Sequence, residues 1–286
     1  MFDLSPIIAN ATELARQSDL DIIRHHPRLQ VVAGGLFLLG LLCDVLLLTR
    51  RPIISDRVGA KPWGRGEVVV AVSLLVIGQL LLQVILNFAH TDGEETWALA
   101  LFGNLALNLV LLAALALYLR RRGITLREAF GFTASAPLTG LIGYLAVLPP
   151  VVVAMGITQL CYQALRIELT PQPVADLFLT TESPDILILV AGLAIVVAPV
   201  FEEVFFRGFL YPVLKAKWGM PVALATVSLV FAAIHLHLPS TAPLFLLGLA
   251  LGLVYERSGS LLASITLHSL FNTANILMLF YLRHHA

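Results

Sequence analysis

The 286-residue chain is 58% hydrophobic and only 13% charged, with a mean hydropathy of +0.90 and a formal net charge of +0. Soluble globular proteins carry about 25% charged residues, so this composition excludes a water-exposed globular body and predicts an integral membrane protein. The balanced charge argues against nucleic-acid binding. Cys43 and Cys161 lie in apolar segments, which favours buried or lipid-facing thiols over a disulfide or a metal site.

The apolar runs predict an all-α fold, a polytopic transmembrane helical bundle of about eight spans. Residues 1–30 are polar and precede the first long apolar run, so we expect a short interfacial helix at residues 11–23 and no signal peptide. Each run approaches the about 20 residues that cross a bilayer. The predicted spans are residues 31–49, 68–89, 97–119, 138–165, 185–214, 220–238, 242–255 and 259–282.

Polar side chains inside the second and third spans repeat every four residues. Gln79, Gln83 and Asn87 do so in the second span, and Asn104 and Asn108 in the third. This spacing places each set on one helix face. Hydrogen bonds between helices are the favoured explanation, and a pore lining is the alternative.

The middle of the chain contains further breaks. Pro149 and Pro150 should kink or interrupt the fourth span. Residues 123–137 form a connector with a short interfacial helix expected at 126–130, and residues 166–185 are the longest polar loop. We find no internal repeat and no low-complexity segment.

Basic residues indicate the orientation. Eight spans place both termini on one side, and most of the 18 Lys and Arg residues fall in the loops of the other side. Because cytoplasmic loops carry the excess of positive charge, both termini are predicted to be non-cytoplasmic.

The stretch Pro199-Val-Phe-Glu-Glu-Val-Phe-Phe-Arg-Gly208 places two adjacent carboxylates at the end of an apolar run. Charged groups at membrane depth indicate a functional site by default. Glu203 and Arg207 are four residues apart and can pair, whereas Glu202 is turned about 100° away from that face. An unpaired acid is a candidate acid or base. The alternative is that the helix simply leaves the membrane here.

Other titratable residues cluster in the last three spans. His235 ends the segment that begins at Phe231, and His268 and Asn272 share a helix face through their spacing of four. A lone histidine in an apolar helix is more often a packing residue. Beside an acidic helix, however, these residues supply a carboxylate base, an imidazole and an amide donor, which hydrolysis of an acyl bond by water requires. His237 is expected to be an interface residue.

Residues 199–272 resemble the signature region of the CAAX protease and bacteriocin-processing family, which includes the prenyl-protein endopeptidases and their bacterial relatives. That family has three motifs in a fixed order. They read here Glu202-Glu203-x-x-x-Arg207, Phe231-x-x-x-His235 and His268-x-x-x-Asn272.

The resemblance implies a catalytic core at residues 181–286, in the last four spans, preceded by accessory transmembrane helices at 31–180 and a polar segment at 1–30. It implies an intramembrane endopeptidase for membrane-associated or prenylated peptides. We expect a bacterial plasma membrane, and the orientation indicated by the basic residues predicts a site that opens toward the cytoplasm. Glu202 and His235 would activate water, His268 and Asn272 would stabilise the oxyanion, and Glu203, Arg207 and Phe231 would support the site.

Metal dependence is an open alternative. Glu202, His235 and His268 are also a possible zinc ligand set with water in the fourth position. The sequence lacks the His-Glu-x-x-His helix of soluble zinc proteases. Asn272 is a poor zinc ligand, which favours a reaction without a cofactor.

Two other functions are compatible with these residues. Intramembrane Glu, His, Gln and Asn also mark the ion path of a proton-coupled transporter, although transporters usually show internal repeats. The scaffold also suits a catalytically silent bacteriocin-immunity or binding protein. The sequence names neither the substrate nor the oligomeric state.

The depth of the acids is a separate prediction. If the fifth helix began at Asp185, Glu202 would lie only a few Å from the cytoplasmic side, whereas His235 and His268 lie about 21 and about 12 Å deep at about 1.5 Å per residue. These side chains converge only if the fifth helix is long and tilted or displaced, so that its acids lie well inside the bilayer.

Overall fold

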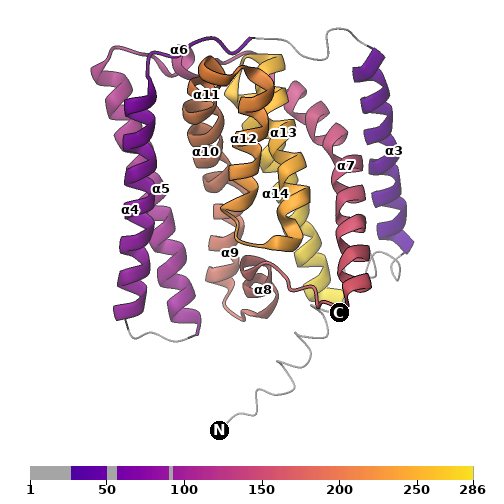
Figure 1. Cartoon of the computed structure of the whole chain (residues 1–286). Coiled ribbons are helices and arrows are strands. Elements are labelled where there is room, and N and C mark those ends of the chain that lie inside the picture. Colours follow the sequence, from indigo (N-terminus) through magenta and orange to yellow (C-terminus); the bar gives the residue numbers. More distant parts are fainter. Residues whose placement is uncertain (1–26, 50–56, 90–92, 286) are drawn as a thin grey trace.

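The computed structural model describes residues 27–49, 57–89 and 93–285. Within these residues, seven helices are long and apolar enough to cross a membrane, and one apolar helix is shorter. The chain is a polytopic helical bundle, as predicted (Figure 1). Its long helices are α3 (Pro27–Thr49), α4 (Arg65–Phe88), α5 (Glu94–Arg121), α7 (Ala136–Leu165), the composite run Pro184–Trp218, α13 (Thr241–Ser258) and α14 (Leu261–His285), and the shorter helix is α12 (Met220–Ala233).

The bundle has a central group of helices with a flank on either side. Helices α12, α13 and α14 stand beside the composite run at the centre, while α4 and α5 form a hairpin on one flank and α3 packs on α7 at the other (Figure 1). Gln79 of α4 donates to Asn104 of α5 at 3.1 Å, which confirms the predicted hydrogen bond between these helices. Gln83 instead bonds to Asn87 of its own helix.

The composite run Pro184–Trp218 is a single helical segment of 35 residues in which α-helical and π-helical parts alternate. Two π-helical turns lie on either side of a short α-helix. In order, its parts are α9 (Pro184–Gly192), η1 (Leu193–Val197), α10 (Ala198–Glu203), η2 (Val204–Leu210) and α11 (Tyr211–Trp218).

A proline follows each of these π turns. At the first, the amide of Ala198 donates to the carbonyl of Leu193, five residues back, and Pro199 comes next. At the second, the amide of Tyr211 also donates five residues back, and Pro212 comes next. Proline has no amide hydrogen, and its ring crowds the carbonyl four residues back. A wider turn just before the proline relieves that crowding.

Helix α7 continues through Pro149 and Pro150, so the expected interruption of the fourth span is not observed. Pro149 deprives the carbonyl of Leu145 of its usual donor. This carbonyl and the Pro149 ring lie against Gly40 of α3, where any side chain would clash. The close approach of α3 therefore covers the weak point of α7.

Three segments refine the predicted boundaries. The connector contains α6 (Leu126–Phe130), as predicted, whereas the supposed loop 166–185 contains a further helix, α8 (Pro173–Thr180). Arg283 of α14 donates to the carbonyl of Phe178 at 3.0 Å and so fixes α8 in place. Helix α12 ends at Ala233, five residues before the predicted end of its span. The interfacial helix expected at 11–23 lies outside the described residues.

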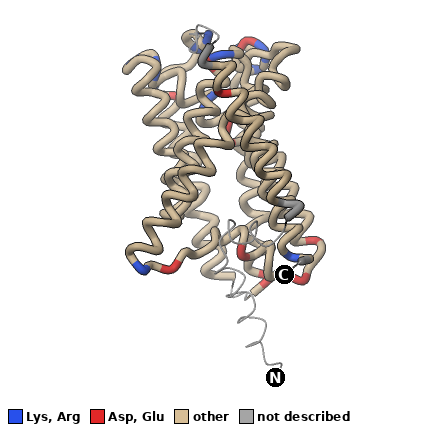
Figure 2. The backbone as a smooth tube through the Cα atoms, turned by 90° about the vertical axis from the view of Figure 1, so that its right-hand side faces the viewer, with Lys and Arg blue, Asp and Glu red and all other residues tan. Residues whose placement is uncertain are grey.

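Charge is distributed unevenly between the two ends of the bundle. Lys and Arg gather at the end that carries α6 and α11, whereas Asp and Glu are more frequent at the opposite end, near the C-terminus (Figure 2). Both cysteines are free, with Cys43 half-buried and Cys161 exposed, which agrees with their predicted lack of a disulfide.

Candidate functional site

The two acids lie near the middle of the composite run, in α10 between the π turns. At about 1.5 Å per residue, Glu202 is about 24 Å from the end of the run at Trp218. This long helix is what the depth prediction required. The acids lie far from either end of this helical segment, and their depth in a bilayer stays a prediction.

Glu203 and Arg207 form the predicted ion pair. Arg207 Nη1 donates to Glu203 Oε1 at 2.7 Å, and the two side chains are 1% and 0% exposed. The second terminal nitrogen of Arg207 donates to the carbonyl of Gly248 in α13 at 3.1 Å. Since a buried charge needs an opposite charge and hydrogen bonds, this pair neutralises itself within the core.

His268 lies between the two acids. Its Nδ1 is 3.0 Å from Glu203 Oε1, and its Nε2 is 3.8 Å from Glu202 Oε2. Because an ionised carboxylate can only accept, this network assigns a proton to Nδ1 and turns Nε2 toward Glu202. The carboxylate of Glu202 is 20% exposed, and its Oε2 is buried without a hydrogen-bond partner. Glu202 is therefore the uncompensated acid of the pair, as its spacing predicts.

His235 lies in a turn just after α12 and not on a helix, which corrects the predicted span. Its Nδ1 is 2.7 Å from the carbonyl of Phe231. A carbonyl only accepts, so Nδ1 carries the proton and the lone pair of Nε2 stays available as an acceptor. The two candidate histidines are thus held in different ways, one by a carboxylate and one by a carbonyl.

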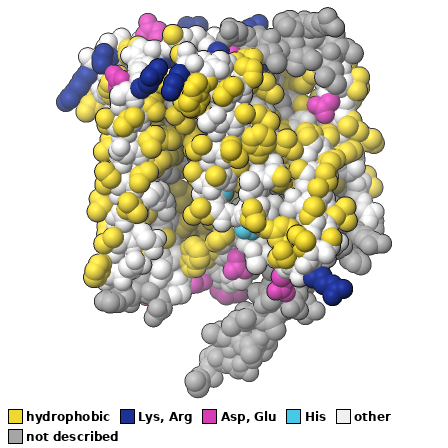
Figure 3. All heavy atoms as spheres, in the orientation of Figure 1, with side chains coloured by type: hydrophobic (Ala, Val, Ile, Leu, Met, Phe, Trp, Pro, Cys, Tyr) yellow, Lys and Arg dark blue, Asp and Glu magenta, His cyan; other side chains and the backbone are white. Residues whose placement is uncertain are grey.

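Phe231 connects the parts of the site. Its buried ring makes edge contacts with His235 at 5.0 Å and with His268 at 5.7 Å between ring centroids. The guanidinium carbon of Arg207 lies 4.7 Å from the centre of the same ring. In Figure 3, histidine side chains are visible between hydrophobic side chains on the face of the molecule that is turned toward the viewer.

Asn272 is joined to the first π turn. Its Nδ2 donates to the carbonyl of Ala194 at 2.7 Å. The amide of Ala198 is already directed to Leu193, and Pro199 has no hydrogen to give, so neither helical donor reaches the Ala194 carbonyl. The side chain of Asn272 supplies the missing bond and retains a second N–H.

The possible zinc ligands are not arranged as a ligand set. Within residues 27–49, 57–89 and 93–285, no group of three or more His, Cys, Asp or Glu side chains could hold a metal ion. Glu202, His235 and His268 are therefore not brought together as a metal-binding group among these residues, and independence from a metal stays a prediction.

Sequence reasoning missed the contribution of α13. Its Gly248 accepts from Arg207, and a side chain at Gly248 would lie 2.9 Å from Ser228 of α12. A side chain at Gly252 would meet Leu224 of the same helix. The spacing Gly248-x-x-x-Gly252 is typical of closely packed membrane helices. It is visible in the sequence and could have predicted the close packing of α13.

Comparisons with known proteins identify the family of the chain. A family model described as "Type II CAAX prenyl endopeptidase Rce1-like" matches residues 184–274, which include the acids, both histidines and Asn272. An uncharacterised 24.3 kDa protein of Escherichia coli is 30% identical over 162 residues, which cover 55% of this chain and 71% of that protein. No solved structure matches. The chain belongs to the Rce1-like family of type II CAAX prenyl endopeptidases.

Proposed function

We propose that the protein is a membrane-embedded endopeptidase that hydrolyses peptide bonds of membrane-associated or prenylated peptides. The observation that carries this proposal is the unpartnered Oε2 of Glu202, 3.8 Å from Nε2 of His268 in the middle of an apolar helix. Membership of the family supports the reaction class. The substrate is proposed only as a class, a peptide held at the membrane.

The first step is activation of water. Glu202 acts as the general base and takes a proton from water, while the free Nε2 of His235 accepts the second O–H and orients the oxygen. The oxygen then attacks the peptide carbonyl carbon. When the C–N bond breaks, the proton held by Glu202 passes to the leaving amine. Each turnover therefore consumes one water and restores the carboxylate.

Stabilisation of the oxyanion is the proposed role of His268 and Asn272. With Nδ1–H directed to Glu203, His268 can donate to the oxyanion through Nε2 only in its doubly protonated form. The second N–H of Asn272 is the other donor. Removing one such donor typically reduces kcat by about 10²–10³-fold.

Glu203, Arg207 and Phe231 are positioning residues in this proposal. Arg207 balances the charge of Glu203, Glu203 orients the His268 ring, and Phe231 packs on both histidines. None of the three is expected to touch the scissile bond.

The experiment measures cleavage of lipidated peptides by the purified protein in proteoliposomes. Wild-type protein should produce two defined fragments, and Glu202→Gln should form them about 10²–10⁴-fold more slowly while remaining folded. Glu95→Gln, which changes an exposed acid in the first turn of α5, is the matched control and should cleave normally. Cleavage by Glu202→Gln at the wild-type rate would refute the proposed base.

Metal independence is part of the proposal. We expect full activity after exhaustive chelation and dialysis, with no stoichiometric metal in the active protein. Activity that is lost on chelation and restored by zinc alone would refute it.

The transporter and silent-protein alternatives make different predictions. A transporter would move protons or solute across proteoliposomes in a Glu202-dependent manner without fragments. A silent protein would retain its cellular function in Glu202→Ala.

We further propose a bacterial plasma membrane as the location, with both termini outside and the site opening toward the cytoplasm. The basic end of the bundle in Figure 2 supports this orientation, because cytoplasmic ends carry positive charge. A reporter fused after residue 286 should be active only on the outer side, and cytoplasmic activity would reverse the assignment.

A further inference from the structure

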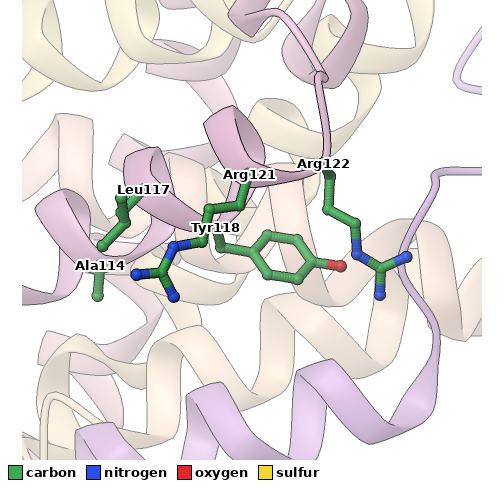
Figure 4. A pocket seen from close by; sticks show the side chains of 5 residues that line it. All are labelled: Ala114, Leu117, Tyr118, Arg121 and Arg122. Carbon is green, nitrogen blue, oxygen red and sulfur yellow. The ribbon is translucent and has the colours of Figure 1, made fainter.

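Two adjoining hollows lie at the basic end of the bundle, beside the α4–α5 hairpin. The inner cavity, about 530 Å³, lies between α4, α5 and the segment of the composite run from Phe201 to Phe209. The outer hollow, about 420 Å³, is lined by α5 alone and shares Ala114 and Tyr118 with the inner one. Arg121 and Arg122 of the outer hollow lie on either side of the Tyr118 ring (Figure 4).

The inner cavity exists because the hairpin is tied to the core at its two ends. At the basic end, Trp63 donates to the carbonyl of Phe209 at 3.2 Å and stacks on its ring at 5.1 Å. At the other end, Glu94 accepts from the hydroxyl of Thr181 at 2.6 Å and from the amide of Glu182 at 3.2 Å. Between these ties, apolar surfaces of hairpin and core face each other across the cavity.

The two hollows differ in chemistry. Apolar side chains line the inner cavity, among them Val70, Leu74, Leu115 and the stacked rings of Phe201 and Phe205. Its volume falls in the range of about 300–1,000 Å³ that is typical of ligand pockets. The inner cavity therefore suits a hydrocarbon chain.

Two arginines, Arg121 and Arg122, line the outer hollow. Glu67, on the rim, is engaged by the Tyr118 hydroxyl and by Arg122, each at 3.3 Å. The guanidinium of Arg121 has no ion pair or side-chain hydrogen bond with the other described residues. A basic mouth leading to an apolar interior at the level of the lipid headgroups recognises an anionic amphiphile.

We propose that this cleft binds an anionic phospholipid of the surrounding bilayer. Its phosphate lies at Arg121 and Arg122, and one acyl chain enters the inner cavity against Phe201 and Phe205. A peptide segment does not fit there, because its backbone groups would find few hydrogen-bond partners among apolar walls. The bound chain fills the space between the hairpin and the helix that carries Glu202, and so supports that helix.

The test uses the purified full chain exchanged into nanodiscs that contain phosphatidylcholine with or without phosphatidylglycerol. Native mass spectrometry counts the lipids retained after release, and thermal unfolding measures their effect. We expect selective retention of one phosphatidylglycerol and a higher Tm in its presence. Neither readout requires peptidase activity, so the result is separate from that of the proposed function.

Matched variants examine the two halves of the cleft. Arg121→Gln and Arg122→Gln should each lower the preference for phosphatidylglycerol about fivefold, whereas Arg127→Gln, an exposed arginine of α6 at the same end, should not. Ala71→Phe should fill the inner cavity and reduce retention, whereas Leu81→Phe on an exposed face of α4 should not.

Equal retention of both lipids by the wild-type protein would overturn the proposal. So would an Arg127→Gln effect as large as that of Arg121→Gln, or displacement of phosphatidylglycerol by a lipidated peptide in proportion to its cleavage. The last outcome would make the cleft part of the substrate site instead.

Discussion

The side-chain amide of Asn272 donates to the main-chain carbonyl of Ala194 at 2.7 Å, and this bond joins the last helix to the π turn before the acids. A carbonyl without a helical donor thus lies next to one of the residues proposed to bind the oxyanion. The same asparagine therefore has a structural contact that can be measured apart from any catalytic one.

Asn272→Leu should both destabilise the protein and abolish cleavage. The change leaves the Ala194 carbonyl unsatisfied, which costs about 1–3 kcal/mol. Thermal unfolding in detergent measures the loss. Asn108→Leu, a similar change in α5, is the control and should have a smaller effect. An unchanged Tm for Asn272→Leu would mean that the bond contributes nothing.

Glu202→Gln should affect catalysis and Glu203→Gln should affect stability, although the two residues are neighbours. Glu202→Gln should reduce kcat by about 10²–10⁴-fold at normal stability, because it removes only a general base. Glu203→Gln leaves Arg207 buried without its partner and should cost about 3–5 kcal/mol of stability. Parallel measurements of kcat and Tm separate the two. Equal loss of stability in both variants would contradict the division of roles.

Pro199→Ala should lower activity without lowering stability. Alanine restores an amide hydrogen and removes the ring, so the helix can exchange the π turn η1 for ordinary α-helical bonds. That exchange rotates Glu202 away from His268. Cleavage assays and hydrogen exchange around residue 199 measure the two effects. Pro137→Ala, in the first turn of α7, is the control. Full activity with new protection at residue 199 would refute this explanation.

His237 should position the turn that carries His235. Its Nε2 is 2.8 Å from the carbonyl of Thr170, and its Nδ1 is 2.7 Å from the hydroxyl of Ser240. Between the two histidines, Leu236 has a φ of 50°, an uncommon value for this residue type that the surrounding contacts must maintain.

The test compares two substitutions at that position. His237→Gln keeps a donor and an acceptor and should retain most of the activity, whereas His237→Leu keeps neither and should reduce kcat with little change in KM. Steady-state kinetics on one lipidated peptide distinguish them. Equal activity of the two variants would show that these hydrogen bonds are dispensable.

Local spacing accounts for what could be predicted from the sequence. Four-residue spacing identified the Glu203–Arg207 pair and placed Gln83 on the same face as Asn87, to which it bonds, because these contacts depend on helix geometry alone. Contacts between helices that are distant in the sequence were harder to predict. The Gly248 carbonyl reaches Arg207 only through the packing of α13. The residue type at this position does not indicate that its main-chain carbonyl accepts a hydrogen bond from a side chain.

The ends of elements were predicted less well for a similar reason. Residues 234–238 alternate isoleucine or leucine with histidine, and the apolar members of this segment extended the predicted sixth span to Leu238. The helix ends earlier, at Ala233. Beyond this end, His237 bonds to the hydroxyl of Ser240 and to the carbonyl of Thr170 in a distant loop. The π turns of the fifth helix were not predicted, although the prolines at 199 and 212 that follow them are visible in the sequence.

The early end of α12 has a consequence for the bilayer itself. Its 14 residues span about 21 Å, less than the about 30 Å of a hydrocarbon core. Beyond it, Leu236 and Leu238 are 93% and 76% exposed, in a turn that also carries His235. Lipids adapt to a short helix by thinning locally. We therefore expect a dimple in the membrane beside the histidines, which shortens the distance that a polar peptide backbone has to descend.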